Sequence, residues 1–314
     1  MHESALVFLF LAMKEGRVIQ STGSWYLVDT GDEELTRCRL PGKFRLKEQK
    51  VTNPLAVGDI VEIQINEDGT GTVQHIKERK NYLPRKATHG RRGEQILVAN
   101  VDEAFVVQSA QQPQYNEGFI DRFLVICEAY EIKGGIIINK MDLADGELKE
   151  DILDLKFLYE NLGYRVFLTS IQDEKSIQNL EEDIAGQTSV FIGSSGVGKS
   201  SILNAIDEDL GLQIGEISSY SNKGKHTTTF ARLIRLENNG YVVDTPGIRE
   251  LGLVHIEPYE LSLFFPEMLE ARQGCKFSTC THHHEPGCGV IKALEAGEID
   301  PGRYHSYLQM LDSL

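Results

Sequence analysis

A glycine-rich run from Gly193 to Ser200 has the residue types and spacing of a phosphate-binding loop. Glycines let backbone N–H groups converge on a β-phosphate, and the start of the following helix adds the positive end of its dipole. The Lys199 ammonium would neutralise β- and γ-phosphate oxygens, and the Ser200 hydroxyl would bind magnesium. The predicted phosphate contacts lie along this run, at Gly193, Ser194, Ser195, Gly196, Val197, Gly198, Lys199 and Ser200.

A second motif, Asn139-Lys140-Met141-Asp142, has the residue types that read a guanine base. The Asp142 carboxylate can accept hydrogen bonds from the guanine N1–H and exocyclic amine, whereas adenine offers an acceptor at N1 and lacks that amine. The Lys140 stem would lie along the base, and Thr169-Ser170 would support the base from its other side. Four-residue motifs also arise by chance, so an accidental match is the alternative.

A third motif, Asp244-Thr245-Pro246-Gly247, has the form of a magnesium and γ-phosphate sensor. Asp244 would hold magnesium through water, and the Gly247 N–H would donate to the γ-phosphate, so that hydrolysis releases the following loop. The same four residues also form an ordinary turn. About 50 residues after a phosphate loop, the sensor is the favoured interpretation.

The segment Gly224-Lys225-His226-Thr227-Thr228-Thr229 offers a threonine that would complete the magnesium shell, although it also fits a plain polar loop. Many GTPases carry a water-orienting glutamine just after the sensor, and Ile248 stands there in this chain. His226 is the nearest side chain in sequence that could orient water. The predicted catalytic residues are therefore His226, Lys199 and Thr228.

These motifs stand in an unusual order along the chain. In an ordinary GTPase the phosphate loop comes first and the base-reading motif follows the sensor, whereas here the base-reading motif precedes both. The base-reading motif is therefore either accidental or part of a circularly permuted domain. The elements that carry the motifs decide between these two possibilities.

From about residue 95 the pattern alternates between buried strands and helices, which predicts a parallel α/β sheet. Each of the three motifs directly follows a strand, and ligands bind at the carboxyl edge of such sheets. This common placement favours permutation. The predicted strands cover 104–107, 135–138, 166–168, 190–192 and 241–243, and the predicted helices cover 117–130, 149–162 and 200–205.

Residues 14–86 show short alternating runs separated by turns, which predicts a small β-barrel of the oligonucleotide-binding type. Trp25, Tyr26 and Phe44 would either stack on bases or fill the barrel core. Residues 14–92 hold 15 Lys or Arg against 11 Asp or Glu, a net charge of +4, whereas the whole chain carries −15. A basic region on an acidic chain fits selective contact with a phosphate backbone, and a solvated surface with uneven charge is the alternative. Residues 77–92 are expected to form a basic linker.

Three cysteines and a histidine near the end have the spacing Cys275-x4-Cys280-x-His282-x5-Cys288. Three thiolates and one imidazole suit a closed, structural zinc site. From spacing alone, His283 and His284 are alternatives to His282, and free thiols without a metal are a further alternative. Helices are predicted around this cluster at 257–269 and 302–314.

The apolar runs and the two remaining cysteines indicate which classes of protein are not expected. No apolar run reaches the length of about 20 residues that a membrane span needs, so no membrane association is expected. Residues 1–12 are expected to be an extension without a structural role. Cys38 and Cys127 are expected to be small buried thiols, and a disulfide framework is not expected, which suits a cytoplasmic protein.

With these motifs in this order, the chain resembles the ribosome small subunit-dependent GTPase A family of circularly permuted bacterial GTPases. The resemblance implies an N-terminal barrel that binds RNA at 13–88, a permuted GTPase domain at 93–252 and a C-terminal helical zinc domain at 253–314. It implies that Asn139 to Asp142 bind guanine, that Gly193 to Ser201 bind the phosphates, that Thr228 senses magnesium, and that His282 joins the three cysteines on zinc.

The resemblance also implies hydrolysis of GTP to GDP, slow alone and faster on the small ribosomal subunit, in late assembly of that subunit. The implied cofactors are one structural zinc ion and magnesium with GTP, and the implied partners are the small subunit and its rRNA, bound by a monomer. Two other functions remain open: an RNA-binding assembly factor with GTP as a structural ligand, and a switch acting on a protein or large-subunit partner.

Overall fold

The computed structural model describes residues 13–22, 24–44, 54–85, 95–212, 231–244 and 256–314. Contacts divide the chain into two compact units. The first contains residues 1–100 and 228–234, and the second contains residues 101–227 and 235–314. The division into three domains at residues 88–93 and 252–253 therefore stays a prediction, and each compact unit is described by itself.

In the described residues of the first unit, five strands form a closed barrel, as the alternating pattern predicts. Antiparallel pairing joins β1 to β2, β2 to β3 and β5 to β4, a parallel pairing joins β3 to β5, and β4 returns to β1. Side chains such as Val18, Val28 and Ile63 are fully buried inside it. The strands are β1 (Met13–Ser21), β2 (Tyr26–Asp29), β3 (Thr36–Arg39), β4 (Ile60–Ile65) and β5 (Gly71–Ile76).

The expectation of a linker at 77–92 is wrong for part of that segment. Residues 82–85 form strand β6 (Tyr82–Arg85), which pairs antiparallel with β7 (Gln95–Ala99). Leu83 is fully buried, so its apolar side chain stabilises a strand that the surrounding basic residues hide from pattern reading. The first unit also contains a short 3-10 helix, η1 (Gly42–Phe44), and β12 (Arg232–Arg235) pairs with β1 at Gln20.

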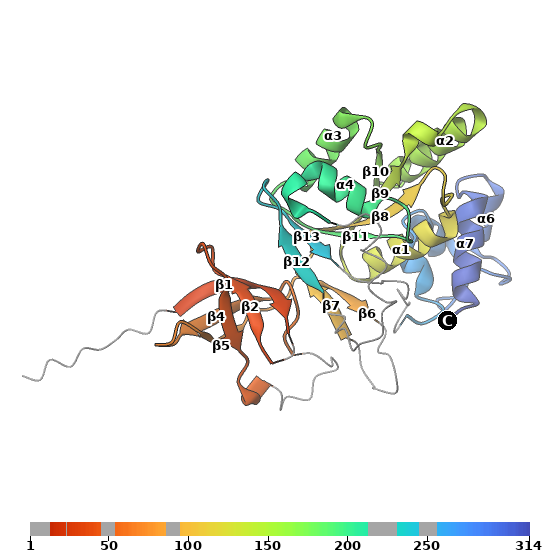
Figure 1. The fold of residues 1–314 in the computed structure, drawn as a ribbon. Coiled ribbons are helices and arrows are strands. Elements are labelled where there is room, and N and C mark those ends of the chain that lie inside the picture. The colour runs from red at the N-terminus through yellow and green to blue at the C-terminus, as the bar shows by residue number, and fades with distance from the viewer. Residues whose placement is uncertain (1–12, 23, 45–53, 86–94, 213–230, 245–255) are drawn as a thin grey trace, which may run out of the picture. The chain divides into compact units, whose positions relative to one another are not determined.

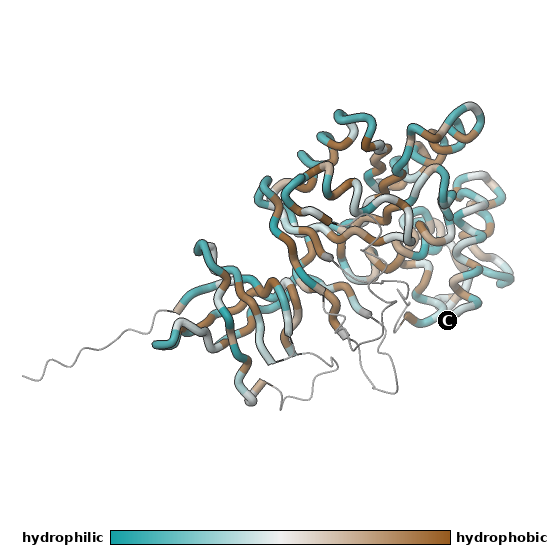
Figure 2. The backbone as a smooth tube through the Cα atoms, in the orientation of Figure 1, coloured by the Kyte–Doolittle hydropathy of each residue, from teal (hydrophilic) through white to brown (hydrophobic). Residues whose placement is uncertain are grey.

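The second unit is built on a parallel sheet with the strand order β10-β9-β8-β11-β13. The central strands are mainly hydrophobic along their length (Figure 2), which is typical of a sheet buried on both faces. These strands confirm the α/β pattern. They are β8 (Glu103–Ser109), β9 (Lys133–Asn139), β10 (Arg165–Leu168), β11 (Thr188–Ile192) and β13 (Tyr241–Asp244).

Helices lie on either side of this sheet (Figure 1). Asn116 caps the first of them by accepting a hydrogen bond from the Phe119 N–H at 2.8 Å, and the apolar face of that helix packs on β8 and β9. The phosphate-loop strand leads directly into α4, as expected. The helices are α1 (Glu117–Ala129), α2 (Gly146–Asn161), α3 (Glu174–Ile184) and α4 (Lys199–Ile206), with the short η2 (Met141–Leu143) and η3 (Glu208–Leu210).

The C-terminal part of the second unit differs from its prediction in one respect. The expected helix at 257–269 is wrong, because Pro266 has no N–H to continue a helix and Phe265 is extended and fully buried. The chain instead forms short segments, η4 (Leu261–Phe264), α5 (Met268–Ala271) and η5 (Arg272–Gly274), followed by α6 (Gly289–Glu295). The last predicted helix is confirmed as α7 (Pro301–Leu311).

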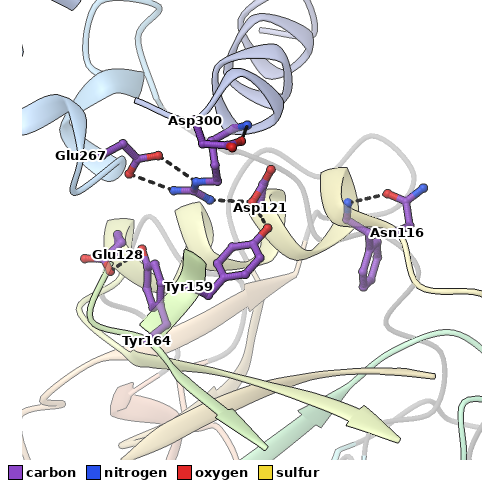
Figure 3. A network of polar contacts seen from close by, with 9 residues as sticks. Asn116, Asp121, Glu128, Tyr159, Tyr164, Glu267 and Asp300 are labelled. Atoms are coloured by element: carbon purple, nitrogen blue, oxygen red, sulfur yellow. Dashed lines mark hydrogen bonds and ion pairs between the residues drawn. The ribbon is translucent and has the colours of Figure 1, made fainter. Parts of the chain in front are cut away.

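A buried ionic network ties α7 to the helices beside the sheet (Figure 3). The Arg303 guanidinium donates to Asp121 of α1 at 2.6 Å and to both carboxylate oxygens of Glu267 at 2.8 and 3.1 Å. The Tyr159 hydroxyl of α2 donates to the same Asp121 oxygen at 2.5 Å. Burial alone would lower the pKa of Arg303, but the two carboxylates outweigh it and raise that pKa. Arg303 therefore stays charged at every pH at which the fold exists.

No helix in the part of the chain that the structure describes is both long and apolar enough to cross a membrane.

We expect Arg303→Met to lower the free energy of unfolding by about 3–5 kcal/mol, because it leaves Asp121 and Glu267 buried without a cation. Arg122→Ala is the matched control, since Arg122 follows Asp121 on α1 but makes an exposed contact with Ser313. That control should change stability by at most about 0.5 kcal/mol. Urea unfolding followed by circular dichroism measures both.

The triple variant Asp121→Asn/Glu267→Gln/Arg303→Met leaves no buried charge at this network, so it should recover most of the lost stability. A triple variant as unstable as Arg303→Met would show that packing around Arg303, rather than the uncompensated carboxylates, determines the loss.

Candidate nucleotide and metal sites

The predicted nucleotide motifs follow strands of the same parallel sheet. β9 ends at Asn139, β11 ends at Ile192 just before the phosphate loop, and β13 ends at Asp244. β10 ends at Leu168, directly before Thr169. Because parallel strands share a carboxyl edge, these motifs lie at one edge of the sheet, which is where α/β sheets bind ligands.

The Asn139 side chain joins three segments at this edge. Its Nδ2 donates to the Val197 carbonyl at 2.9 Å, and its Oδ1 accepts from the Thr169 hydroxyl at 3.1 Å. Asn139 is buried, at 2% exposure, so these bonds satisfy an amide that water cannot reach. The base-reading motif is therefore in contact with the phosphate loop, as a shared nucleotide site requires.

Gly198 is needed at the point where Asn139 meets the phosphate loop. Its backbone has φ +97°, and a Cβ there would lie 2.2 Å from Asn139 Nδ2. Gly193 is constrained in the same way, since its Cβ would lie 2.2 Å from the Val107 carbonyl oxygen. Any larger residue at either position would displace the backbone. These glycines therefore fix the path of the loop.

Lys140 adds a second bridge between the base-reading motif and the phosphate loop. Its backbone adopts a left-handed conformation with φ +60°. Its Nζ donates to the Gly196 carbonyl at 2.6 Å and also to the Gln112 carbonyl. The contact with Gln112 is one that the sequence analysis missed, because it joins residues 28 positions apart in the chain. The stem of Lys140 thus crosses from one motif to the other.

Asp142 is exposed, and neighbouring side chains hold its carboxylate in place. Oδ1 accepts from the Ser170 hydroxyl at 2.5 Å, and Oδ2 accepts from Gln172 Nε2 at 3.2 Å. The Met141 N–H donates to the Thr169 carbonyl at 3.1 Å, which aligns the two loops. A carboxylate has about four acceptor positions, so Asp142 keeps capacity for the two guanine donors. Gln172 lies two residues beyond the predicted support, Thr169-Ser170, and was not anticipated.

The phosphate loop meets the start of α4, whose first residue is Lys199. The Lys199 ammonium donates to the carbonyls of Gly193 and Ser194, both at 2.8 Å. Only 8% of Lys199 is exposed, and burial lowers its pKa to about 8. The loop itself thus holds the cation where a phosphate would arrive. Of the other predicted phosphate contacts, Val197 and Ser200 are buried, and Ser195 and Gly196 lie in the exposed turn.

Several of the predicted site residues lie outside the part of the chain that the structure describes. They are His226, Thr228 and Gly247, and Ile248 lies outside it as well. The backbone of Asp244 ends β13, whereas its side chain is not described.

The predicted metal ligands lie together. Cys275, Cys280, His282 and Cys288 each offer one ligand atom, and these atoms lie within 4.8 Å of one another. The His282 Nδ1 is 3.4 Å from both Cys275 Sγ and Cys288 Sγ, and those two sulfurs are 3.9 Å apart. Tetrahedral zinc would space two thiolates about 3.8 Å apart and a thiolate and imidazole about 3.5 Å apart. The donor set and its spacing therefore fit a tetrahedral ion.

Outer contacts orient these ligands. The His282 Nε2 lies 2.9 Å from the Ser262 hydroxyl, which leaves Nδ1 to face the sulfurs. The N–H groups of Gly289 and Ile291 donate to the sulfurs of Cys275 and Cys288. Burial raises the pKa of the Cys280 thiol to about 12, so a bound cation is what would favour the thiolate.

The structure also separates His282 from its neighbours in sequence. His282 is buried at 1% exposure, with a left-handed backbone at φ +56° that turns its ring inward. His283 and His284 are exposed, and their N–H groups donate to the carboxylate of Glu285. Neither of the two belongs to the cluster.

We expect His282→Ala to lose most of the bound metal, because it removes one ligand from a closed set of four. His283→Ala is the matched control and should keep one metal ion per chain. Inductively coupled plasma mass spectrometry of the purified variants gives the metal content, and thermal unfolding gives the accompanying loss of stability. Equal metal content in the two variants would contradict the assignment of His282.

Two family models match the parts of the chain that carry the barrel and the nucleotide motifs. The model of the family described as RsgA GTPase matches residues 76–254, and that of the RsgA N-terminal domain matches residues 15–73. Two curated relatives, from Bacteroides fragilis and Cytophaga hutchinsonii, carry the name small ribosomal subunit biogenesis GTPase RsgA. The first is 41% identical and covers 95% of this chain and 96% of the relative. The second is 43% identical and covers 95% and 97%.

Two solved structures are also similar. The crystal structure of YjeQ from Thermotoga maritima is 36% identical, with a TM-score of 0.78, covering 96% of this chain and 99% of that one. The structure of YloQ, described as a circularly permuted GTPase, is 35% identical, with a TM-score of 0.74 and coverage of 100% and 97%. The barrel, the permuted order of the motifs and their common position at one edge of the sheet agree with these matches. The chain belongs to the RsgA GTPase family.

Proposed function

We propose that this protein hydrolyses GTP to GDP and phosphate and acts in the biogenesis of the small ribosomal subunit. The observation that carries the enzymatic part is the Asn139 side chain, which bonds the base-reading motif to the phosphate loop at one edge of the sheet. The biological part is supported by the curated relatives, which are named small ribosomal subunit biogenesis GTPases.

In this proposal the residues of the chain position the nucleotide and offset the negative charge of its phosphates. Asp142, held by Ser170, would accept the guanine donors, and the backbone N–H groups from Gly193 to Ser201 would surround the phosphates. Lys199 would offset the negative charge that develops on the β- and γ-phosphates. Magnesium would be bound by Ser200 and Thr228, with Asp244 acting through water, and would neutralise phosphate oxygens.

The γ-phosphate contact and the water-positioning group are proposed from sequence. Gly247 would donate to the γ-phosphate, and His226 would orient the attacking water, because Ile248 cannot do so. The Asp244 backbone at the end of β13 supports the placement of the sensor beside the phosphate loop.

The metal in the cluster is proposed to be zinc, with a structural role. Three thiols and one imidazole form a soft donor set, and four protein ligands leave no position open for a reacting molecule. Zinc would link Cys275 and Cys280 to the start of α6 at Cys288.

The proposed partners are the small subunit and its rRNA, bound by a monomer in the cytoplasm. The described barrel supports the RNA contact through the positive charge of its region, 15 Lys or Arg against 11 Asp or Glu in residues 14–92. An RNA-binding factor with GTP as a structural ligand, or a switch for a protein or large-subunit partner, would give different results in the experiment below.

GTP turnover is expected to rise when purified small subunits are titrated into the full-length protein, and large subunits should give no rise. Lys199→Ala should reduce the stimulated rate at least about 100-fold, because transition-state charge loses its cation. Lys175→Ala, an exposed lysine of α3, is the matched control. His226→Ala should lower the stimulated rate about 100-fold while GTP affinity holds.

Each alternative has its own outcome in that assay. GTP binding without turnover on subunits would support a structural ligand, and stimulation by large subunits or by a protein fraction would support a different partner. Lys199→Ala turning over like the control would overturn the assignment of the phosphate loop.

Nucleotide affinity should also depend on pH through Lys199. Its pKa is about 8 without nucleotide, because of burial, and an adjacent phosphate would raise it. Below pH 8 the ammonium is already charged, whereas above pH 8 nucleotide binding must take up a proton. GDP affinity should therefore fall above pH 8, approaching tenfold per pH unit.

Fluorescent GDP titrations between pH 7 and pH 9 measure this slope, and calorimetry in two buffers of different ionisation enthalpy measures the proton uptake. Lys199→Ala should bind more weakly but lose the slope. A wild-type affinity that stays flat to pH 9 would show that Lys199 keeps an ordinary pKa in the free protein.

A further inference from the structure

Trp25 lies immediately before β2, and two arginines lie over its ring. The guanidinium carbon of Arg39 is 4.1 Å from the ring centroid, and that of Arg37 is 4.9 Å away. Trp25 is partly exposed, and both arginines are exposed. The other aromatic side chains named with it in the sequence analysis belong to the interior, since Tyr26 is buried in the barrel core and Phe44 packs against that core.

Strand register shows which residues share the outer face with Trp25. Tyr26 pairs with Cys38, and Cys38 pairs with Gly71, and these positions face the core. Residues one step along each strand face outward, because side chains alternate. The outward positions on β3, β5 and β4 include Arg37, Arg39, Thr72, Gln74 and Gln64, and also the carboxylate of Glu62.

Close to Trp25 the chemistry of this outer face is aromatic, cationic and amide, and Glu62 adds a carboxylate further along β4. Gln74 Nε2 donates to Gln64 Oε1 at 2.9 Å, so the two amides lie side by side. Gln64 pairs with Thr72, which in turn pairs with Arg39. In the described part of the chain, Arg37 and Arg39 form no ion pair. The pKa of Asp68 is lowered mainly by hydrogen bonds from Thr70 and to a smaller degree by Arg39.

We propose that this outer face binds a single-stranded segment of RNA, with one unpaired base stacked on Trp25 and the two arginines on flanking phosphates. The site refines the RNA contact of the proposed function and rests on it. Guanidinium groups that stack on an aromatic ring mark a surface that a base can occupy, because every base offers a π-face of the same kind. Duplex RNA keeps its bases stacked inside the helix and cannot use Trp25 in this way.

A protein partner fits these observations less well. The face holds two arginines stacked on Trp25 and an amide pair, whereas protein interfaces rely on a buried apolar centre. Leu27 is the apolar side chain opposite Arg37, and it is only partly exposed. A polyanion with flat aromatic groups matches both features of the face, and single-stranded RNA has both.

The chain contains one tryptophan, so intrinsic fluorescence reports on this position alone. Titration of the full-length protein with an unstructured 12-nucleotide RNA should quench the emission, and the same RNA in duplex form should leave it unchanged. Trp25→Ala should weaken binding of a labelled RNA about tenfold or more, while Trp25→Phe should retain most of it. Fluorescence anisotropy measures these affinities.

Arg37→Ala and Arg39→Ala should each weaken RNA binding and flatten its salt dependence, because each removes a phosphate contact. Arg232→Ala is the matched control, since Arg232 is an exposed arginine of the same compact unit on β12. An unchanged affinity in Trp25→Ala, or an equal loss in Arg232→Ala, would overturn the proposal. Equal quenching by inorganic polyphosphate would also overturn it, because polyphosphate has no base to stack.

Failure of this inference is separable from failure of the proposed function. Subunit-stimulated turnover that persists in a protein without oligonucleotide quenching would leave the GTPase proposal standing and remove the Trp25 site. Quenching without stimulated turnover would leave the Trp25 site standing and remove the GTPase proposal.

Discussion

The side-chain amide of Asn139 makes the contact on which the arrangement of the nucleotide motifs, at the carboxyl edge of the sheet, depends. It holds the end of β9, the loop after β10 and the phosphate loop with two hydrogen bonds, and it is buried where neither bond can be replaced by water. Gly198 is left-handed and lacks a Cβ because that amide occupies the space. The order of the motifs along the chain is thus irrelevant to the site, since a side chain rather than the backbone joins its halves.

The metal cluster is attached to the same body by α7. The Tyr304 hydroxyl donates to the His282 carbonyl at 2.8 Å, and the Tyr307 hydroxyl donates to the Thr281 carbonyl at 2.7 Å. Arg303, the residue directly before Tyr304, enters the buried network with Asp121. A single helix therefore joins the loop that carries a metal ligand to α1, and the described C-terminal residues belong to the second compact unit rather than to a separately packed one.

Residue types and strand ends could be predicted from the sequence because they depend on local patterns. The positions of Asn139, Asp142 and Lys199 follow from strands that are apolar on both faces. Contacts between distant segments could not be predicted: Gln172 on Asp142 is a consequence of tertiary packing. The choice of His282 over its neighbours is also tertiary, because it depends on a backbone turn that aims one ring inward. The resemblance supplied that choice where spacing left it open.

Permutation also changes the order in which the strands of the sheet are synthesised. β8, β9 and β10 leave the ribosome before β11, yet β11 pairs with the free side of β8 and lies between β8 and β13. Until residue 192 has been made, β8 is an edge strand without a partner on that side. All seven of its residues are buried in the folded protein. Open hydrophobic edges are prone to wrong pairing. The strands that carry the base-reading motif therefore cannot complete their pairing until the strand before the phosphate loop has been made.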